Sequence, residues 1–153
     1  MSSVNPRILR HTSITRRLDF DAGHRVLGHE GKCAHLHGHR YTVLVTVRAP
    51  ELDRLGRVID FSVVKERIGG WIDENWDHNL LLHPDDPQAA HLCKTEKRPP
   101  WLMPPGPAAN PTAENLAAVL FAECRRLLPA GLAVERVRVY ETPNCMADYT
   151  ADE

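Results

Sequence analysis

The chain has 153 residues, a hydrophobic content of 42% and a formal net charge of -1. This length and composition predict a single domain over residues 1–153 with one hydrophobic core. The near-neutral charge and the scattered Lys and Arg residues argue against a nucleic-acid partner, because no basic stripe could follow a phosphate backbone. The sequence contains no signal-peptide core and no run of about 18 apolar residues, so we expect a cytoplasmic protein without a membrane partner.

The first predicted element is a strand over residues 13–24. Its apolar positions, including Leu18 and Phe20, share one parity along the chain, while the charged residues occupy the other parity, with Arg16 as the exception. His24 ends this strand on the apolar side. A polar ring at such a position needs a partner, because burying it unpaired costs free energy.

A second strand is predicted over residues 40–49, directly after a His-Gly-His sequence that holds His37 and His39. Side chains alternate across a strand, so both rings leave the face that also carries the valines of this strand. Pairing the two strands as a wide hairpin, with residues 25–36 as its loop, brings His24 beside them. Three imidazoles with one open coordination position are typical of catalytic zinc, and we therefore predict a Zn²⁺ site.

A helical pattern and a proline-rich segment follow. Apolar residues at helical spacing predict a helix from Phe61 to about Ile72, with a break or a close helix contact at Gly69-Gly70. Residues 83–111 hold eight of the twelve prolines and show no periodicity, so we expect a long excursion from the core and not a domain linker. Two roles are open for it: covering an active site, or packing on a neighbouring subunit.

The C-terminal part of the sequence predicts one helix and two strands. Thr112 is suited to cap a helix whose apolar stripe runs to Leu128. A strand over residues 134–142 places Glu141 at the end of an apolar row, where its carboxylate needs a ligand with N–H donors. A short strand is expected around residues 146–150. The predicted order strand, strand, helix, helix, strand, strand describes an α+β domain.

Other polar residues are candidates for a site. Asp77 and His78 are adjacent, and at a helix end both can turn toward one site, although helix capping is the alternative. His91 and Cys93 are more typical of an exposed loop than of a metal site. Cys145 is either a second active-site thiol near the predicted carboxylate or a packing residue.

Six short motifs occur in order along the sequence. They are Phe20-Asp21-Ala22-Gly23-His24, Cys33 ahead of His37-Gly38-His39, Ile59-Asp60-Phe61, Asp77-His78, Asn110-Pro111-Thr112-Ala113-Glu114, and Glu141-Thr142-Pro143-Asn144. With these motifs the chain resembles the 6-pyruvoyltetrahydropterin synthase and 6-carboxytetrahydropterin synthase family. The resemblance implies the tunnelling fold, in which two helices lie on one face of a four-stranded antiparallel sheet and several subunits close into a barrel. It also implies a homo-oligomer, usually a hexamer, with active sites between subunits.

The resemblance implies a role for each residue near the metal. His24, His37 and His39 become the zinc ligands, and Cys33 becomes the base that abstracts a proton. A thiol at this position can lie beside the metal without closing its coordination, where nearby cations favour the thiolate. The alternative is that Cys33 is a fourth ligand and that zinc only holds the fold, as in closed Cys-His sites.

The resemblance also implies that Asp77 and His78 form a proton relay and that Glu141 anchors the pterin and is coupled to this relay. The implied substrate is 7,8-dihydroneopterin triphosphate. We expect conversion to 6-carboxy-5,6,7,8-tetrahydropterin on the queuosine pathway. The alternatives are elimination of triphosphate to the 6-pyruvoyl product, an aldolase-type cleavage, or a non-catalytic zinc-stabilised pterin-binding protein. Arg25 and Lys32 are candidates for holding the triphosphate.

Overall fold

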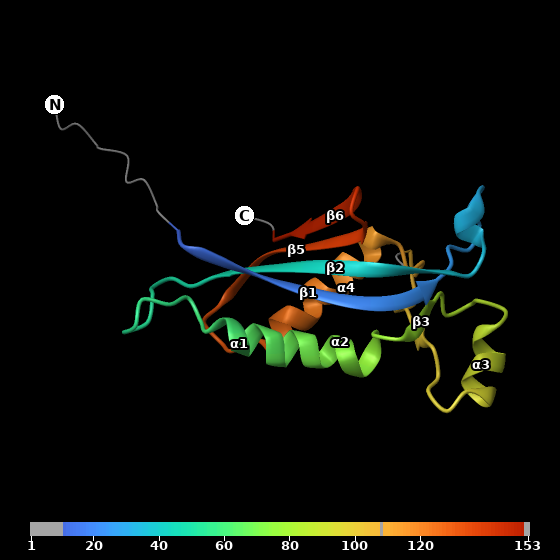
Figure 1. Ribbon diagram of the computed structural model, residues 1–153, viewed down its shortest axis with the longest axis horizontal. Helices are drawn as coiled ribbons and strands as arrows, with labels where there is room; N and C mark the ends of the chain where they lie inside the picture. The colour runs from blue at the N-terminus through green and yellow to red at the C-terminus, as the bar shows by residue number, and fades with distance from the viewer. Residues whose placement is uncertain (1–10, 108, 152–153) are drawn as a thin grey trace.

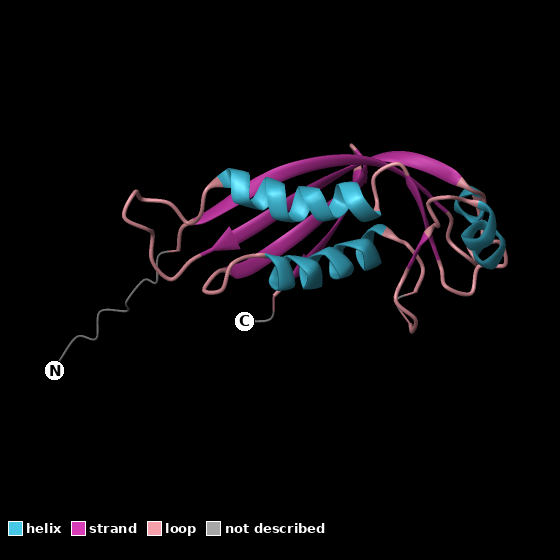
Figure 2. Cartoon of the chain, turned by 90° about the horizontal axis from the view of Figure 1, so that it is seen from below, coloured by secondary structure: helices cyan, strands magenta, loops and turns pink. Residues whose placement is uncertain are grey.

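The computed structural model describes residues 11–107 and 109–151. A sheet forms one layer, and two helical rods lie side by side on one of its faces (Figure 1, Figure 2). A short third helix, α3, lies apart from these rods, beyond one end of the sheet (Figure 2). None of the helices in the described residues is long and apolar enough to cross a membrane.

The strands β1 (Ser13–His24) and β2 (His37–Arg48) form a long antiparallel hairpin, which confirms the predicted pairing. Its loop contains one 3-10 turn at Lys32–Ala34. The hairpin extends further than the alternating valines indicate, because the His-Gly-His segment is itself extended and His37 pairs with His24. The two strands that carry the predicted ligands are therefore direct neighbours.

Within the described part of the chain, the sheet has six strands in the order β4-β3-β1-β2-β5-β6. Two of them, β5 (Ala133–Thr142) and β6 (Cys145–Thr150), continue the antiparallel arrangement beyond β2. The other two, β3 (Asn79–Leu82) and β4 (Trp101–Leu102), lie parallel on the far side of β1. The prediction of a purely antiparallel four-stranded sheet is therefore wrong, since the sheet is mixed. Strands of four and two residues are too short to reveal a period-two alternation.

The first helical rod is continuous and consists of α1 (Phe61–Val64), a π-helical turn (Lys65–Gly69) and α2 (Gly70–Asn75). The break expected at the paired glycines is absent, because both have helical backbone angles. The close contact that was the alternative is present: a Cβ added to Gly69 would lie 3.5 Å from the side chain of Leu18. The rod therefore packs directly on β1.

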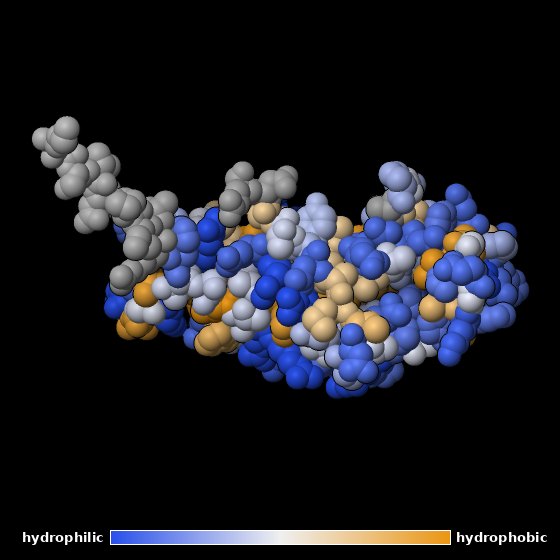
Figure 3. Space-filling model, turned by 90° about the horizontal axis from the view of Figure 1, so that it is seen from above, coloured by the Kyte–Doolittle hydropathy of each residue, from blue (hydrophilic) through white to orange (hydrophobic). Residues whose placement is uncertain are grey.

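The second rod is α4 (Ala113–Leu127), which begins as predicted with the Thr112 hydroxyl accepting the Asn115 amide. It covers the sheet beside the first rod, and the core lies between these layers (Figure 2). The opposite face of the molecule is mainly hydrophilic (Figure 3). Residues with no exposed surface come from both layers: Tyr41, Val43, Val45, Val64, Ile68, Leu116, Leu120 and Val137.

The proline-rich excursion is more regular than the sequence suggests. It contains α3 (Ala89–Thr95) and then β4, which pairs with β3. Trp101 of β4 packs against Trp71 of α2 and against Trp76, the residue that caps α2, with ring centroids 6.1 and 5.4 Å apart. The sequence shows no periodicity here because these elements are too short to give a periodic pattern among the prolines. The excursion is anchored to the helical layer.

Candidate active site

Three imidazoles converge at the closed end of the hairpin. Nε2 of His24 and Nε2 of His37 are 3.1 Å apart. Nε2 of His39 lies 3.2 Å from Oε1 of Glu141, which comes from the end of β5. One ligand atom from each of the four residues lies within 4.8 Å of all the others. The structure thus brings together the three predicted zinc ligands and the predicted pterin anchor.

Backbone carbonyls determine which nitrogen of two rings faces this centre. Nδ1 of His24 lies 2.7 Å from the carbonyl oxygen of Pro111, and Nδ1 of His37 lies 2.7 Å from that of His35. A carbonyl only accepts hydrogen bonds, so each Nδ1 carries the hydrogen and each Nε2 keeps a lone pair. The two lone pairs are therefore turned inward, as metal ligation requires.

Burial favours the neutral form of two of these rings. His24 is 1% exposed, and burial lowers its pKa below the ordinary histidine value, although the bond to Pro111 and the charge of Glu141 act in the opposite direction. Burial also lowers the pKa of His39, although the negative charge of Glu141 acts to raise it. Neutral imidazole is the form that binds a metal ion.

The donor set fits zinc. Nε2 of His39 is a buried nitrogen without a hydrogen-bond partner among the described residues, because its contact with Glu141 lacks hydrogen-bond alignment. An orphaned buried nitrogen costs free energy unless it is bound by something else. Three imidazole nitrogens form a zinc ligand set found in catalytic sites, so a zinc ion would satisfy this nitrogen.

Cys33 lies beside the centre but outside its ligand set. A cavity of about 230 Å³ is lined by Cys33 and Glu141 together with Cys145 and Glu114. Within residues 11–107 and 109–151, the group of ligand atoms within 4.8 Å of one another does not include the Cys33 sulfur. Cys145 is exposed in the single subunit, so packing within the subunit does not account for it. Sequence reasoning missed Glu114 as a cavity residue, because an acid in the first turn of a helix is already explained by the helix dipole.

Asp77 and His78 form a pair at a separate place. Nδ1 of His78 lies 2.9 Å from Oδ2 of Asp77, and Oδ1 of Asp77 accepts the Asp21 amide at 3.0 Å. Burial would raise the pKa of the Asp77 carboxyl, but the hydrogen bonds from Asp21 and His78 outweigh it and hold this pKa below the ordinary value. The carboxylate is therefore ionised and orients the imidazole.

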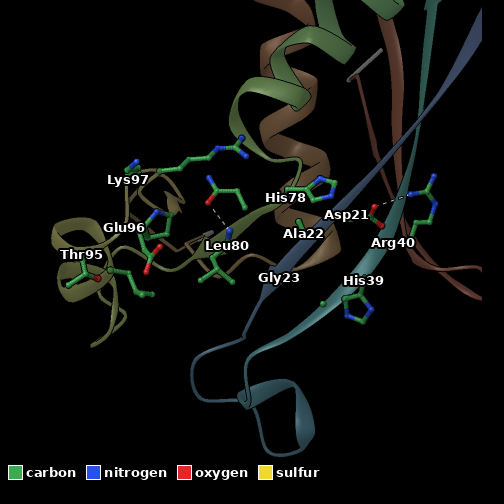
Figure 4. Close-up of a pocket in the computed structure, with 15 residues that line it drawn as sticks. Asp21, Ala22, Gly23, His39, Arg40, His78, Leu80, Thr95, Glu96 and Lys97 are labelled. Atoms are coloured by element: carbon green, nitrogen blue, oxygen red, sulfur yellow. Dashed lines mark hydrogen bonds and ion pairs between the residues drawn. The ribbon is translucent and has the colours of Figure 1, made fainter.

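The pair and the imidazole centre belong to different sides of the hairpin. Asp21 and His24 are three positions apart on β1, so their side chains leave opposite faces. Figure 4 shows His78 beside Asp21, whereas the ring of His39 points in another direction. Within the described residues of one subunit, the ligand atoms of the predicted proton relay and of the predicted zinc site form two separate groups, although His39 and His78 line the same cavity.

A large cavity of about 980 Å³ opens beside this pair. The hairpin supplies one wall with Asp21 and Arg40, which form an ion pair at 3.0 Å. The excursion supplies another wall with Glu96 and Lys97 (Figure 4). His78 also lines this space. The excursion therefore borders the predicted relay.

Arg25 was a candidate for holding the triphosphate, but its guanidinium is engaged by Asp86. Two contacts join the side chains, one of them between Nε and Oδ2 at 2.6 Å. Asp86 is 4% exposed, and the hydrogen bond from Arg25 lowers the pKa of its carboxyl despite burial. Arg25 thus ties the excursion to the end of β1.

Asn110 supports the centre in a way that sequence reasoning missed. Its Oδ1 accepts the Leu27 amide at 2.9 Å, and its Nδ2 donates to the Leu27 carbonyl at 3.1 Å. This pair of hydrogen bonds fixes the segment after His24 to the segment before Pro111, whose carbonyl orients His24. The Asn-Pro-Thr-Ala-Glu motif was noted in the sequence, but only the fold reveals what its first residue contacts.

Fold and site together define an α+β protein with a candidate metal centre built on one hairpin. The family model described as 6-pyruvoyl tetrahydropterin synthase matches residues 13–152. The chain belongs to this family.

Known relatives agree with this assignment. The 6-carboxy-5,6,7,8-tetrahydropterin synthase of Rickettsia felis is 45% identical over 139 residues, which cover 88% of this chain and 96% of the relative. The 6-pyruvoyl tetrahydrobiopterin synthase of Drosophila melanogaster is 30% identical over 148 residues, which cover 89% of this chain and 77% of the relative. Among solved structures, an uncharacterised protein from Wolinella succinogenes has a TM-score of 0.75 and 26% identity, covering 94% of this chain and 100% of that protein.

Proposed function

We propose that this protein is a zinc-dependent lyase that converts 7,8-dihydroneopterin triphosphate and one water molecule to 6-carboxy-5,6,7,8-tetrahydropterin, acetaldehyde and triphosphate. The observation that carries the proposal is the convergence of three imidazoles beside a cavity lined by Cys33 and Glu141. The name of the Rickettsia felis relative supports this product, and we place the reaction on the queuosine pathway in the cytoplasm. Elimination of triphosphate to the 6-pyruvoyl product is the second candidate, and the Drosophila relative favours it.

The residues at the imidazole centre have three different roles in this proposal: metal binding, proton abstraction and substrate binding. Bound by His24, His37 and His39, zinc supplies Lewis acidity that makes the C–H groups next to the substrate's hydroxyls easier to deprotonate. Cys33, in its thiolate form, takes a proton from a C–H group next to the substrate's hydroxyls. Glu141 accepts hydrogen bonds from the amino group and ring N–H of the pterin, which orients the substrate over the thiol.

In this proposal the Asp77–His78 pair serves the zinc centre of a neighbouring copy. The pair lies apart from the imidazole centre of its own subunit, and the side chain of His78 is 75% exposed, so it can face a second subunit. The Asp77 carboxylate orients the imidazole, which then passes protons to and from the substrate. The proposal therefore requires a homo-oligomer, and a hexamer closed into a barrel is the form we expect.

Turnover by the zinc-loaded protein tests the function. With 7,8-dihydroneopterin triphosphate, mass spectrometry should detect 6-carboxy-5,6,7,8-tetrahydropterin together with equal amounts of acetaldehyde and triphosphate. A 6-pyruvoyl product would select the second candidate. Cleavage of unphosphorylated dihydroneopterin alone would indicate aldolase-type chemistry, and no turnover of any of these pterins would remove the lyase. A monomer in sedimentation experiments at assay concentration would contradict the shared site.

A further inference from the structure

The Asp77–His78 pair lies in an unfavourable turn. His78 has a φ of 56°, the only positive φ among the non-glycine residues that the structure describes. A side chain in this left-handed region costs free energy, so the surroundings must hold it there. On one side, the His78 amide donates to the carbonyl of Asp21 on β1 at 2.6 Å. The other side needs a second support.

Arg98, from the excursion, supplies this support. Its Nη1 donates to the carbonyl of Asp77 at 2.5 Å, and its Nη2 donates to the carbonyls of Glu74 and Asp73 at 2.9 and 3.2 Å. These carbonyls lie at or just beyond the end of α2, where a helix leaves acceptors without internal partners. The guanidinium suits them because its donors form a rigid fork and a positive charge is favourable at a helix C-terminus.

The excursion holds Arg98 in place through contacts on both sides of the pair. The residue after it, Pro99, accepts a hydrogen bond from the side chain of Asn79 at 3.3 Å. Trp101 packs against Trp76, with the ring centroids 5.4 Å apart. Asn79 and Trp76 directly flank the Asp77–His78 pair in sequence, so the excursion contacts the turn before, within and after it.

We propose that Arg98 is a positioning residue for the Asp77–His78 pair. It acts through backbone carbonyls and fixes the direction in which the imidazole leaves the turn. The inference rests on the proposed function, in which this pair moves a proton. The excursion then has a definite role: through Arg98 it holds the backbone of the turn that carries the relay, and it does so away from the imidazole centre of the same subunit.

The kinetic test is Arg98→Ala in the zinc-loaded oligomer, with Lys94→Ala as the matched control. Lys94 is another exposed cation of the excursion, and among the described residues its ammonium forms no hydrogen bond with α2. We expect Arg98→Ala to lower kcat about 10- to 100-fold and to change KM less than about threefold, because the relay is displaced while the ligand sites remain. Millimolar guanidinium chloride should restore part of the lost kcat, and Lys94→Ala should match the wild type.

Hydrogen exchange separates this inference from the proposed function. The amides of Trp76, Asp77, His78 and Asn79 all donate to backbone carbonyls, so their exchange reports the turn directly. In Arg98→Ala, these amides should exchange about tenfold faster than in the wild type, whereas those of β1 should not change. This holds whether or not the wild type turns over the pterin.

The outcomes divide clearly. Unchanged amide exchange together with an unchanged kcat would overturn the role of Arg98. A fall in kcat accompanied by a raised KM, loss of bound zinc and no rescue by guanidinium would also overturn it, because this combination indicates a general structural defect. Failure of the wild type alone to turn over any pterin would overturn the proposed function instead. If Arg98→Ala does not fold, Arg98→Lys carries the test, because one ammonium cannot span three carbonyls, and a smaller loss of kcat at constant KM is expected.

Discussion

Replacing Asn110 by alanine should weaken zinc binding without removing any ligand. The amide of Asn110 forms two hydrogen bonds with the backbone of Leu27, at 2.9 and 3.1 Å. These bonds hold together the two segments that carry His24 and Pro111, and the carbonyl of Pro111 orients the His24 ring at 2.7 Å. In Asn110→Ala, the carbonyl is free to move and the ring is less firmly directed at the metal.

The size of the effect follows from these contacts. Two hydrogen bonds with a net value of about 1 kcal/mol each amount to about 2 kcal/mol. Loss of a group that orients a metal ligand typically weakens metal binding about 10- to 100-fold, which corresponds to about 1.4–2.7 kcal/mol. The value from the two hydrogen bonds lies within the range for loss of an orienting group, and we expect the zinc dissociation constant of Asn110→Ala to rise about 30-fold.

Competition with a chromophoric zinc chelator at fixed pH measures this constant. Asn75→Ala is the matched control, because Asn75 also forms a side-chain bond to a backbone carbonyl, that of Trp71, but on α2. This control should bind zinc like the wild type. A zinc affinity of Asn110→Ala within twofold of the wild type would refute the reasoning that the Leu27 contact supports the centre.

Three further predictions concern the thiol, the cavity acid and the buried ion pair. Cys33→Ala should keep its zinc and its fold, measured by atomic absorption and circular dichroism, while kcat falls about 100- to 10,000-fold as for a lost general base. Glu141→Gln should keep zinc and raise KM at least about tenfold, because a neutral amide is a weaker acceptor for the pterin. Asp86→Asn should lower the free energy of unfolding by about 3 kcal/mol at pH 7, because it leaves the charge of the largely buried Arg25 guanidinium without a negative partner. Since the pKa of Asp86 is lowered in the fold, its carboxylate stabilises the protein above the unfolded value of 3.8, and this stabilisation is lost as the pH falls through the lowered folded pKa.

Each of these predictions has a contradicting result. Zinc loss with unfolding in Cys33→Ala would support a closed structural site, and zinc loss in Glu141→Gln would make that residue a fourth ligand. For Asp86→Asn, urea unfolding from pH 7 downward should show its difference from the wild type shrinking at acid pH. A difference that stays constant would mean that the charge of Asp86 does not contribute.

The sequence was informative wherever a short period carried the signal. In each of the two strands, the histidines alternate in step with the apolar residues: His24 in the first strand, His37 and His39 in the second. This pattern predicted a hairpin with the three rings on its buried face, and the structure has both features. The cap at Thr112 was visible because capping depends on local residue types alone. Such features require only the neighbouring residues in the sequence, so they can be recognised without knowledge of the fold.

Contacts between distant segments left no such signal. Nothing near Arg98 indicates that its guanidinium meets the end of α2, more than twenty residues earlier in the sequence. The partnership of Arg25 with Asp86 and that of Asn110 with Leu27 also form only when the excursion returns to the hairpin. The two-residue strand β4 depends on β3 for its existence, so its sequence alone could not predict it.

The π-helical turn at Lys65–Gly69 determines the direction in which the side chains of α2 and the residues after it leave the helix axis. A π turn accommodates a surplus residue, and each residue of an α-helix rotates the backbone by about 100° and advances it by about 1.5 Å. Deleting one residue from this turn would therefore swing Trp76 out of the core and carry the Asp77 carboxylate about a quarter of a revolution around the axis, away from the Asp21 amide. The direction in which the Asp77 side chain leaves the helix axis thus depends on the π-helical turn, which lies more than two helical turns earlier in the chain.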